Sequence, residues 1–265
     1  MKKYLTFFKL RLNIALQYRA AAIGGMFTQF FWAIMQILIF QAFYKVVTSE
    51  NISLEQLISY VWLKQAFYSI ISASTDVEIR DMIEKGNISY ELCKPTNIYW
   101  MWYFKTLANK IAGGFLKSIP ILIVAPLLPA GLALKGSAGI LEFILFLVSL
   151  FLAIALMAGI MNIFYISLFY TMSGKGTASI FYAIVEFFGG TFVPIALMPN
   201  FWQSLCYMLP FSLAADLPFR IYSGSISLDS SWIYILLQII WLLIITVSGT
   251  IIINKRLKKV VIQGG

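Results

Sequence analysis

The stretch Asp76-Val-Glu-Ile-Arg-Asp-Met-Ile-Glu-Lys-Gly-Asn-Ile-Ser-Tyr-Glu-Leu-Cys-Lys-Pro95 decides how this chain folds, because it is charged and lies between apolar segments. It contains five of the eleven acidic residues of the chain. The segments on either side, 57–75 and 111–133, are apolar enough to lie in a bilayer. We therefore predict that 76–95 is a short polar helix and turn outside the membrane, between two spanning helices.

The composition of the whole chain also indicates a membrane protein. The chain is 60% apolar and only 12% charged, whereas soluble domains have roughly 25% charged residues. Its mean hydropathy is +0.85. Too few charges are present to form the polar shell of a soluble domain of 265 residues. We predict an all-α integral membrane protein with a single domain, residues 1–265.

The residue types exclude several kinds of chemistry. The chain has no histidine, so it lacks the commonest metal ligand and the base of a Ser/His/Asp or Cys/His triad. We therefore expect no catalytic residue and no metal site. The net charge is +9, but Lys and Arg cluster at the ends of apolar segments rather than beside base-stacking aromatic residues. Nucleic acid is therefore not an expected partner.

Apolar segments of spanning length predict six transmembrane helices. These are residues 20–44, 57–75, 111–133, 140–170, 178–197 and 230–254. Residues 96–110 contain several Tyr, Trp and Lys residues, a combination typical of the headgroup level, and are predicted to be interfacial.

Two further segments are predicted to be helical without crossing the bilayer. Residues 2–19 have polar side chains at helical spacing and five basic residues, which favours an N-terminal amphipathic interfacial helix over a plain extension of the first span. Residues 198–229 consist of short apolar runs separated by prolines, which limit helix continuation. We predict re-entrant half-helices there, between the fifth and sixth spans.

The distribution of basic residues predicts the orientation. With both ends inside, the inner segments carry 16 of the 20 Lys and Arg residues and the outer segments carry three. Such a bias is a strong positive-inside signal. Both termini and the 75–95 element are therefore predicted to be cytoplasmic.

The spacing within the charged element predicts a capped helix. Thr75 and Glu78 have the spacing of a capping box, and Gly86-Asn87 is a natural helix stop. Ion pairs at i,i+4 are expected between Asp76 and Arg80 and between Asp81 and Lys85. Ile79, Met82 and Ile83 form one apolar face. That face suits a groove of a partner protein, but it also suits a helix that lies on the membrane.

Two ionisable residues lie inside predicted spans, Lys64 in the second and Glu186 in the fifth. Such residues are costly in a bilayer and usually form pairs or face a wet cavity. We expect the two side chains to contact each other. Their contact would serve either as a structural pair between two spans or as a gate or substrate contact.

The segment Ile83-Glu-Lys-Gly-Asn-Ile-Ser-Tyr-Glu-Leu-Cys-Lys-Pro95 resembles a pattern of type-2 ABC transporter permeases, I-x-x-G-x-I-x-x-x-L-x-K-P. The basic N-terminal helix, the prolines at 194, 199, 210 and 218, and the basic residues after the last span also resemble that family of six-span permeases. The resemblance covers essentially the whole chain.

The resemblance implies a transport subunit of a bacterial cytoplasmic membrane that is not itself an enzyme and holds no cofactor. ATP and Mg²⁺ would be bound by a partner, a dimer of ABC ATPase subunits, and a second permease, identical or homologous, would complete the translocation path. The 76–95 element would contain the coupling helix, with the ATPase contact at Glu78, Ile79, Asp81, Met82, Ile83 and Glu84.

The cargo is less closely constrained by the residues. Phe31, Phe187 and Phe188 are candidates for lining the path of an exported amphipathic or hydrophobic small molecule, peptide or lipid, although aromatic residues are also the ordinary filling of a membrane protein. The alternative function is an ATPase-independent secondary transporter or channel. Neither an internal repeat nor a relay of buried carboxylates is apparent to favour it.

Overall fold

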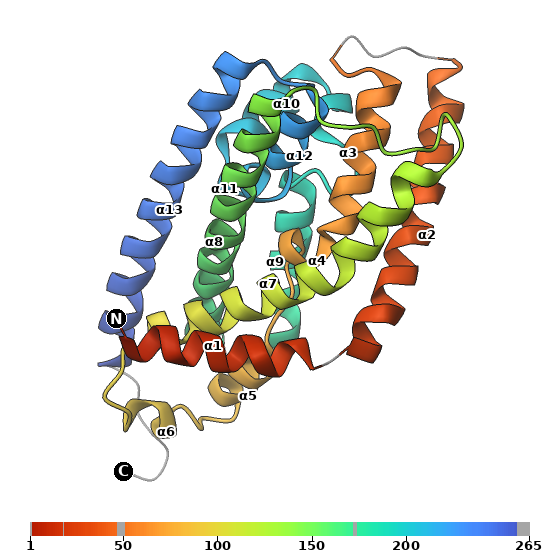
Figure 1. Cartoon of the computed structure of the whole chain (residues 1–265). Helices are drawn as coiled ribbons and strands as arrows, with labels where there is room; N and C mark the ends of the chain where they lie inside the picture. Colours follow the sequence, from red (N-terminus) through yellow and green to blue (C-terminus); the bar gives the residue numbers. More distant parts are fainter. Residues whose placement is uncertain (1, 18, 47–50, 172–173, 259–265) are drawn as a thin grey trace.

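A computed structural model describes residues 2–17, 19–46, 51–171 and 174–258, and all regular structure within these ranges is helical (Figure 1). Four helices in this part of the chain are long and apolar enough to cross a membrane: Ala22–Tyr44, Ile98–Leu127, Ile140–Thr171 and Leu228–Leu257. The all-α membrane fold is therefore confirmed. The number of crossings formed by the shorter helices stays a prediction.

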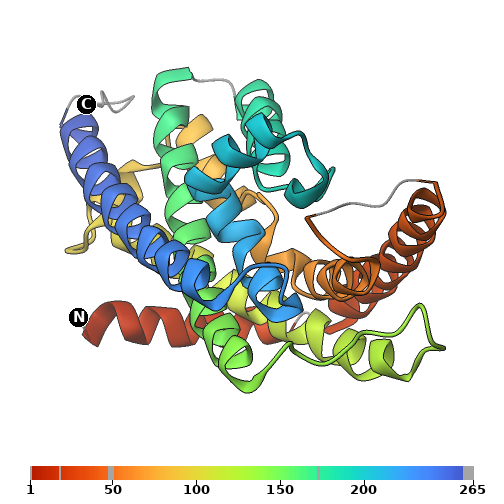
Figure 2. The same ribbon diagram turned by 90° about the horizontal axis from the view of Figure 1, so that it is seen from above.

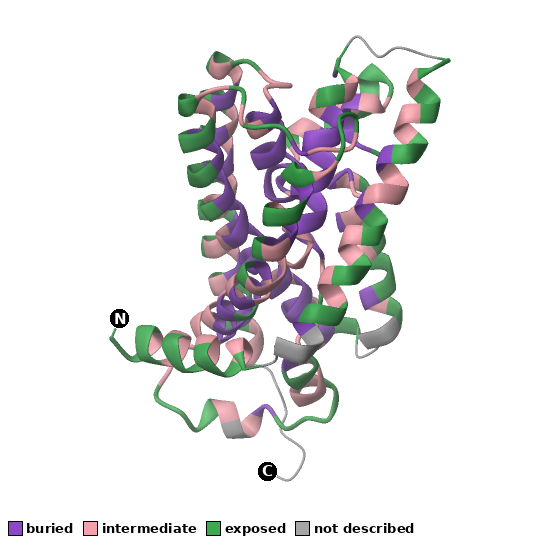
Figure 3. Cartoon of the chain, turned by 45° about the vertical axis from the view of Figure 1, so that its right-hand side comes forward, coloured by how far each residue is buried: buried purple, intermediate pink, exposed green. Residues whose placement is uncertain are grey.

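The longest helix of the described chain is also the most buried of the four long helices. In this helix, α8 (Ile140–Thr171), 61% of the residues in the most apolar 18-residue stretch are buried. The corresponding share is 22% in α13 (Leu228–Leu257). The corresponding value is only 11% for α2 (Arg19–Tyr44), which lies at the edge of the bundle (Figures 1 and 3). The outer faces of α2 and α13 are therefore available to lipid or to another protein.

The second predicted span is broken into two helices. The first, α3 (Leu54–Ala66), begins at a capping box formed by Ser53 and Gln56, and a short α4 (Tyr68–Ile71) follows a break at Phe67. The chain leaves the helix at Ser72, so the prediction of one helix over 57–75 was wrong. At about 1.5 Å per residue, α3 alone is shorter than a bilayer core of about 30 Å.

The predicted boundary between an interfacial segment and a third span is absent. A single helix, α7 (Ile98–Val124), starts at the cap Asn97 and contains Pro120. It ends in a 3₁₀ turn, η1 (Ala125–Leu127). Tyr99 and Trp102 in its first half are buried in a cluster shared with α8, and their predicted place at the headgroup level stays a prediction. The helix runs without a break through the region that was predicted to be interfacial, where these side chains pack on α8.

The fifth predicted span is shorter than expected. Its helix, α9 (Gly174–Phe188), stops ahead of Gly190, which has a φ of +69°. A side chain there would also collide with Ile195, since a Cβ would lie 2.7 Å from its Cγ1. The remainder of the predicted span is a turn and the 3₁₀ helix η2 (Ile195–Leu197).

The proline-marked region contains short helices, as its sequence predicts. These are α10 (Asn200–Met208), α11 (Pro210–Ala215) and α12 (Leu217–Ser223). Most residues of α11 and α12 are buried, and α12 packs between α8 and α3 (Figure 2). Whether this region enters and leaves one leaflet stays a prediction.

The N-terminal helix, α1 (Lys2–Leu16), lies across the end of the bundle and packs along α7 (Figure 1). Tyr4 stacks on Phe104 with ring centroids 6.0 Å apart. The charged element forms α5 (Val77–Glu84) and α6 (Ser89–Leu92) at the same end. The start of α1 and the last turn of α13 also lie there, so both ends of the described chain are on one side of the bundle.

Candidate functional site

The start of α5 is capped by Asp76, not by Thr75 as predicted. Asp76 Oδ1 accepts hydrogen bonds from the backbone N–H groups of Glu78 and Ile79, at 3.0 and 3.3 Å. Thr75 instead contacts α9, because the Tyr182 hydroxyl donates to its Oγ1 at 2.7 Å and accepts from its N–H at 3.1 Å. The predicted stop is confirmed: α5 ends at Glu84, and Gly86 has a φ of +72°.

A charged cluster ties the capped end of α5 to two other helices. We call it the α5 latch, and it consists of Arg11, Asp76, Glu78, Lys105 and Asn109. Lys105 Nζ of α7 lies 2.9 Å from Asp76 Oδ1 and 2.6 Å from Glu78 Oε2. Arg11 of α1 donates to both oxygens of Glu78 at 3.1 and 3.2 Å, and Asn109 donates to Asp76 Oδ2 at 3.1 Å. The latch therefore joins α1, α5 and α7.

The predicted i,i+4 pairs of α5 form only in part. Asp81 pairs with Lys85 at 2.6 Å, as expected. Arg80 does not pair with Asp76, whose oxygens are taken by the latch; it lies 3.8 Å from Asp81 and 3.9 Å from Glu84. Tertiary contacts therefore replace one of the two predicted local pairs.

The latch shifts the ionisation of Glu78. Partial burial favours the neutral acid and raises its pKa, but hydrogen bonds from Lys105 and Arg11 and the charges of both groups favour the carboxylate. The net result is a pKa below the ordinary value of 4.5. Glu78 is therefore ionised at neutral pH and attached to both α1 and α7.

The apolar face of α5 packs against the chain itself. Ile79 is fully buried, in a cluster with aromatic residues of α7 and α8 that includes Trp102 and Tyr165. Met82 and Ile83 are partly buried against the same cluster. This differs from the predicted ATPase contact, because Ile79 is inaccessible to a partner in this structure.

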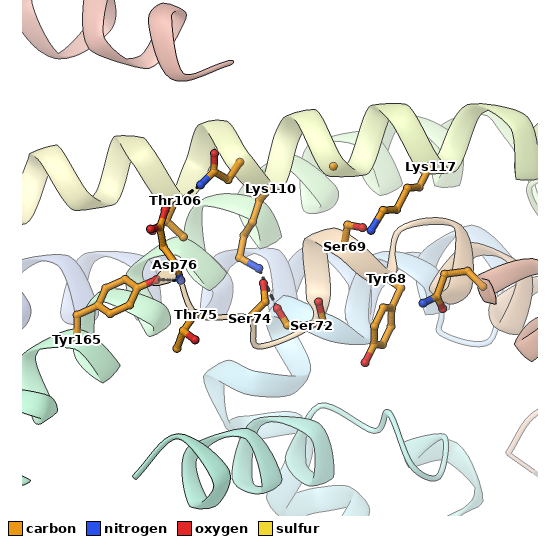
Figure 4. A pocket seen from close by; sticks show the side chains of 13 residues that line it. Tyr68, Ser69, Ser72, Ser74, Thr75, Asp76, Thr106, Lys110, Lys117 and Tyr165 are labelled. Carbon is orange, nitrogen blue, oxygen red and sulfur yellow. Dashed lines mark hydrogen bonds between the residues drawn. The ribbon is translucent and has the colours of Figure 1, made fainter. Parts of the chain in front are cut away.

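The backbone ahead of α5 is held by tyrosine hydroxyl groups of α8 and α9. The N–H of Asp76 donates to Tyr165 OH of α8 at 2.9 Å, as Figure 4 shows. With the contact between Thr75 and Tyr182, the segment is fixed to α8 and α9 as well as to α1 and α7. The start of α5 and the residues just ahead of it therefore contact four helices, α1, α7, α8 and α9.

Lys64 binds the end of α9 but not Glu186. Its Nζ donates to Tyr60 OH at 2.8 Å and to Gly189 O at 3.3 Å, and it also contacts Gly190 O. Within the described residues no ion pair joins Lys64 to Glu186, so the predicted contact is not formed. Because α9 ends at Phe188, backbone carbonyls are available to Lys64 at this point.

A buried acid that the sequence analysis overlooked completes the surroundings of Lys64. Tyr60 OH donates to Asp216 Oδ1 at 2.6 Å, and Arg220 Nε lies 2.6 Å from Asp216 Oδ2. The Arg220 guanidinium lies over the ring of Tyr207, 3.9 Å from its centroid. A charged pair with i,i+4 spacing in an apolar, proline-rich segment was the available signal. The prolines of that segment predicted only short half-helices.

The comparison with known families identifies the chain. A sequence model described as ABC-2 family transporter protein matches residues 30–264. The chain belongs to this family. It is thus a multi-pass membrane transport subunit of the ABC type, a class that associates with an ABC ATPase and is not itself catalytic. Comparison with curated proteins found no match.

The three phenylalanines predicted to line the path of this ABC-2 permease are not all brought together. Phe187 has its ring centroid 5.2 Å from that of Phe188 and 5.5 Å from that of Trp202. Phe31 lies on α2, where it is 69% exposed and has no ring contact with either of them in the described part of the chain. Phe187 and Phe188, at the end of α9, therefore lie beside the short helices that follow, whereas Phe31 does not.

The described residues of this ABC-2 permease also include no group of three or more His, Cys, Asp and Glu side chains that could hold a metal ion. The charged clusters present, the α5 latch and the group around Asp216, are internally paired. Both clusters hold segments of the chain together, and the α5 latch does so at the end of the bundle where α1 and α5 lie.

Proposed function

We propose that this ABC-2 permease is the membrane subunit of an ATP-driven exporter and that α5 is its coupling helix. In this proposal, ATP and Mg²⁺ bind to a dimer of ATPase subunits on the cytoplasmic side of a bacterial membrane. The cargo is an amphipathic or hydrophobic small molecule, peptide or lipid, and it crosses between this chain and a second permease, identical or homologous.

The observation that carries the proposal is the attachment of α5 to the rest of the chain. Lys105 and Arg11 hold Glu78, and Tyr165 and Tyr182 hold the backbone just ahead of the helix. A helix held at so many points moves its neighbours when it is displaced. A partner that pushes on α5 would therefore move α1, α7, α8 and α9.

The outward face of α5 supplies the contact with the ATPase. Val77 is 58% exposed, although it is an apolar residue on a short polar helix. Asp81 and Glu84 lie on the same side of the helix as Val77, whereas Ile79 faces the interior. Of the residues named from the sequence, Asp81 and Glu84 keep their proposed role. The exposed parts of the Met82 and Ile83 side chains also contact the ATPase in this proposal. Glu78 holds α5 to Arg11 and Lys105 of the latch.

The exposed helices supply the surface for a second permease. Large apolar residues are exposed along α2, among them Phe27, Phe31 and Phe43. An apolar surface of this kind faces either lipid or a second spanning protein. Phe31 would then lie close to the junction of the two permeases, consistent with a place on the path.

Two matched substitutions test the coupling role. Val77→Asp places a charge on the outward face of α5, and Val46→Asp makes the same change at the other end of the bundle, where Val46 is 85% exposed. The tagged chain is purified from its membrane, its ATPase subunit is identified by mass spectrometry, and ATP hydrolysis is measured in liposomes. We expect Val77→Asp to lower stimulated hydrolysis by roughly tenfold, as for loss of an interface anchor, and Val46→Asp to leave it unchanged.

Several results would contradict the proposal. Equal hydrolysis by both variants would show that α5 is not the coupling helix. Transport by the purified chain without any ATPase would favour the secondary transporter or channel instead. Proper insertion of each variant is checked by size-exclusion chromatography before the comparison.

A further inference from the structure

A polar cavity of about 320 Å³ lies beside the start of α5. It is enclosed by α4, the segment 72–76 and α7, with α2 at one side, and Figure 4 shows the side chains that line it. Its lining includes three serines, Ser69, Ser72 and Ser74, and two lysines, Lys110 and Lys117. Ionisable residues of membrane helices are rare and usually face the bundle interior or a wet cavity, so two lysines in one cavity mark a candidate site.

Neither lysine is paired with a carboxylate among the described residues. Lys110 is 3% exposed, and its Nζ donates to the carbonyls of Ile70 and Ser72, both at 2.9 Å. An ammonium has three N–H donors, so one donor of Lys110 remains. Lys117 has no hydrogen bond or ion pair in the part of the chain that the structure describes. Two lysines in one cavity with no carboxylate within ion-pair distance among the described residues would be stabilised by an anion.

The two lysines are placed to act together. They are seven residues apart on α7, which puts them on one face of the helix at a rise of about 10 Å. Their side chains extend toward the same wall, Lys110 toward Ser72 and Lys117 toward Ser69 (Figure 4). The buried Oγ of Ser69 has no hydrogen-bond partner, so a hydroxyl donor is also available there.

The one carboxylate in the lining is already neutralised. Asp76 accepts hydrogen bonds from Lys105 and Asn109 and from the N–H groups at the start of α5. Its charge is therefore compensated by Lys105, and it does not serve Lys110 or Lys117 as a counter-ion.

The neighbouring cavity, of about 390 Å³, indicates how an anion would be presented. It shares Asp76, Asn109, Gly113 and Lys117 with the first and continues below the junction of α1 and α2. Its lining combines residues of the α5 latch, which are paired with one another, with apolar residues that include Ile14, Ala22 and Leu116. A molecule with a charged head and an apolar tail fits this combination.

A glycine of α2 makes the room for Lys117. A Cβ at Gly25 would lie 2.9 Å from Cε and 3.1 Å from Nζ of Lys117, so any larger residue would displace the ammonium. The end of the lysine thus lies against the backbone of α2, at the border between the two cavities.

We propose that these two adjoining cavities bind one anionic phospholipid, with its phosphate between Lys110, Lys117 and Ser69 and its acyl chains beneath α1. Free inorganic phosphate shares the charge but not the apolar tail. Binding of a lipid at this site does not depend on the coupling role of α5. A negative result for one proposal therefore does not contradict the other.

The test is native mass spectrometry of the purified full chain titrated with phosphatidylglycerol, phosphatidylcholine or inorganic phosphate. We expect one phosphatidylglycerol per chain, bound at least about tenfold more tightly than phosphatidylcholine, whose trimethylammonium is repelled by the lysines. Lys117→Gln should weaken this binding by about tenfold, the usual worth of a charged hydrogen bond, and Lys117→Arg should retain it.

Lys9→Gln is the matched control, because Lys9 is an exposed lysine of α1 at the same end of the bundle but outside the cavities. It should bind phosphatidylglycerol like the original chain. Ser69→Ala keeps both lysines and should weaken binding by about threefold, which provides a second reading if Lys117→Gln folds poorly. Unchanged binding by Lys117→Gln, equal losses in Lys9→Gln, or binding of inorganic phosphate in place of the lipid would overturn the proposal.

Discussion

Lys105 of α7 and Glu78 of α5 form an ion pair of 2.6 Å that joins the short helix α5 to α7, one of the longest helices of the described chain. The lysine is 4% exposed, whereas the side chain of Glu78 is 54% exposed. The pair is therefore buried on one side and open to solvent on the other. Its loss should release α5 without unfolding the helices that cross the membrane.

Replacing the lysine tests this directly. Lys105→Met keeps the length of the side chain but leaves Asp76 and Glu78 without their shared cation. We expect α5 to open more easily by about 2 kcal/mol, which corresponds to hydrogen exchange about 30-fold faster over residues 77–84. Lys85→Met removes an ion pair in which the lysine is 64% exposed, and it should change exchange by less than about fivefold. Similar exchange in the two variants would show that the latch does not hold α5.

Acid should release the same helix. Because the pKa of Glu78 in the folded chain lies below its ordinary value of 4.5, its stabilising contribution is complete at higher pH and is lost as the pH falls through the lowered value. Cleavage near α5 by pepsin, measured at pH values from about 5 downwards, should therefore increase as the pH falls. Glu78→Gln should be cleaved readily at every pH, with a weaker dependence. A pH profile identical to that of the original chain would argue against Glu78 as the titrating group.

The buried group around Asp216 should dominate the stability of the short helices. Asp216→Ala leaves Arg220 without its partner in a buried site, which costs about 3–5 kcal/mol. Tyr60→Phe removes the hydrogen bond that its hydroxyl donates to Asp216 and the one that it accepts from Lys64, and it should cost about 1.5–3 kcal/mol. Thermal unfolding of the purified variants measures both. The combined variant Asp216→Leu, Arg220→Met should be more stable than Asp216→Ala, since it leaves no unpaired charge.

Close contact between α7 and α13 depends on a glycine. A Cβ at Gly249 would lie 2.6 Å from Cε2 of Tyr99, whereas nothing lies within 4 Å of the corresponding position at Gly24. Gly249→Ala should therefore lower stability by about 1–3 kcal/mol through overpacking. Gly24→Ala should be neutral or slightly stabilising, because alanine favours a helix. Equal melting temperatures for the two variants would contradict the packing described for Tyr99.

Local sequence patterns predicted the elements whose contacts are also local. The helix stop at Gly86, the pair of Asp81 with Lys85 and the short helices after Pro199 all follow from neighbours within a few residues. The long spans α8 and α13 were likewise predicted from continuous apolar runs.

The errors arose where distant residues decide the structure. Asp76 caps α5 and meets Lys105, 29 residues away, so its expected pair with Arg80 does not form. The predicted boundary between 96–110 and the third span is absent, because aromatic residues of α7 pack on α8 and the helix runs on through this region. The contact of Asp216 with Tyr60, 156 residues away in the chain, could not be predicted, although the i,i+4 spacing of Asp216 and Arg220 is a local signal of their ion pair. No periodicity within either segment reports such a contact.

The continuity of α7 has a mechanical consequence. One end of this helix of 27 residues carries Lys105 of the latch, and the other reaches η1 at the opposite side of the bundle. At about 1.5 Å per residue the helix is a rod of about 40 Å, so a tilt of about 10° about one end would carry the other end through about 7 Å. Two helices separated by a break at the predicted boundary would have absorbed such a tilt as a hinge. In the proposed coupling role, a single helix would act as a lever that enlarges a small displacement at α5.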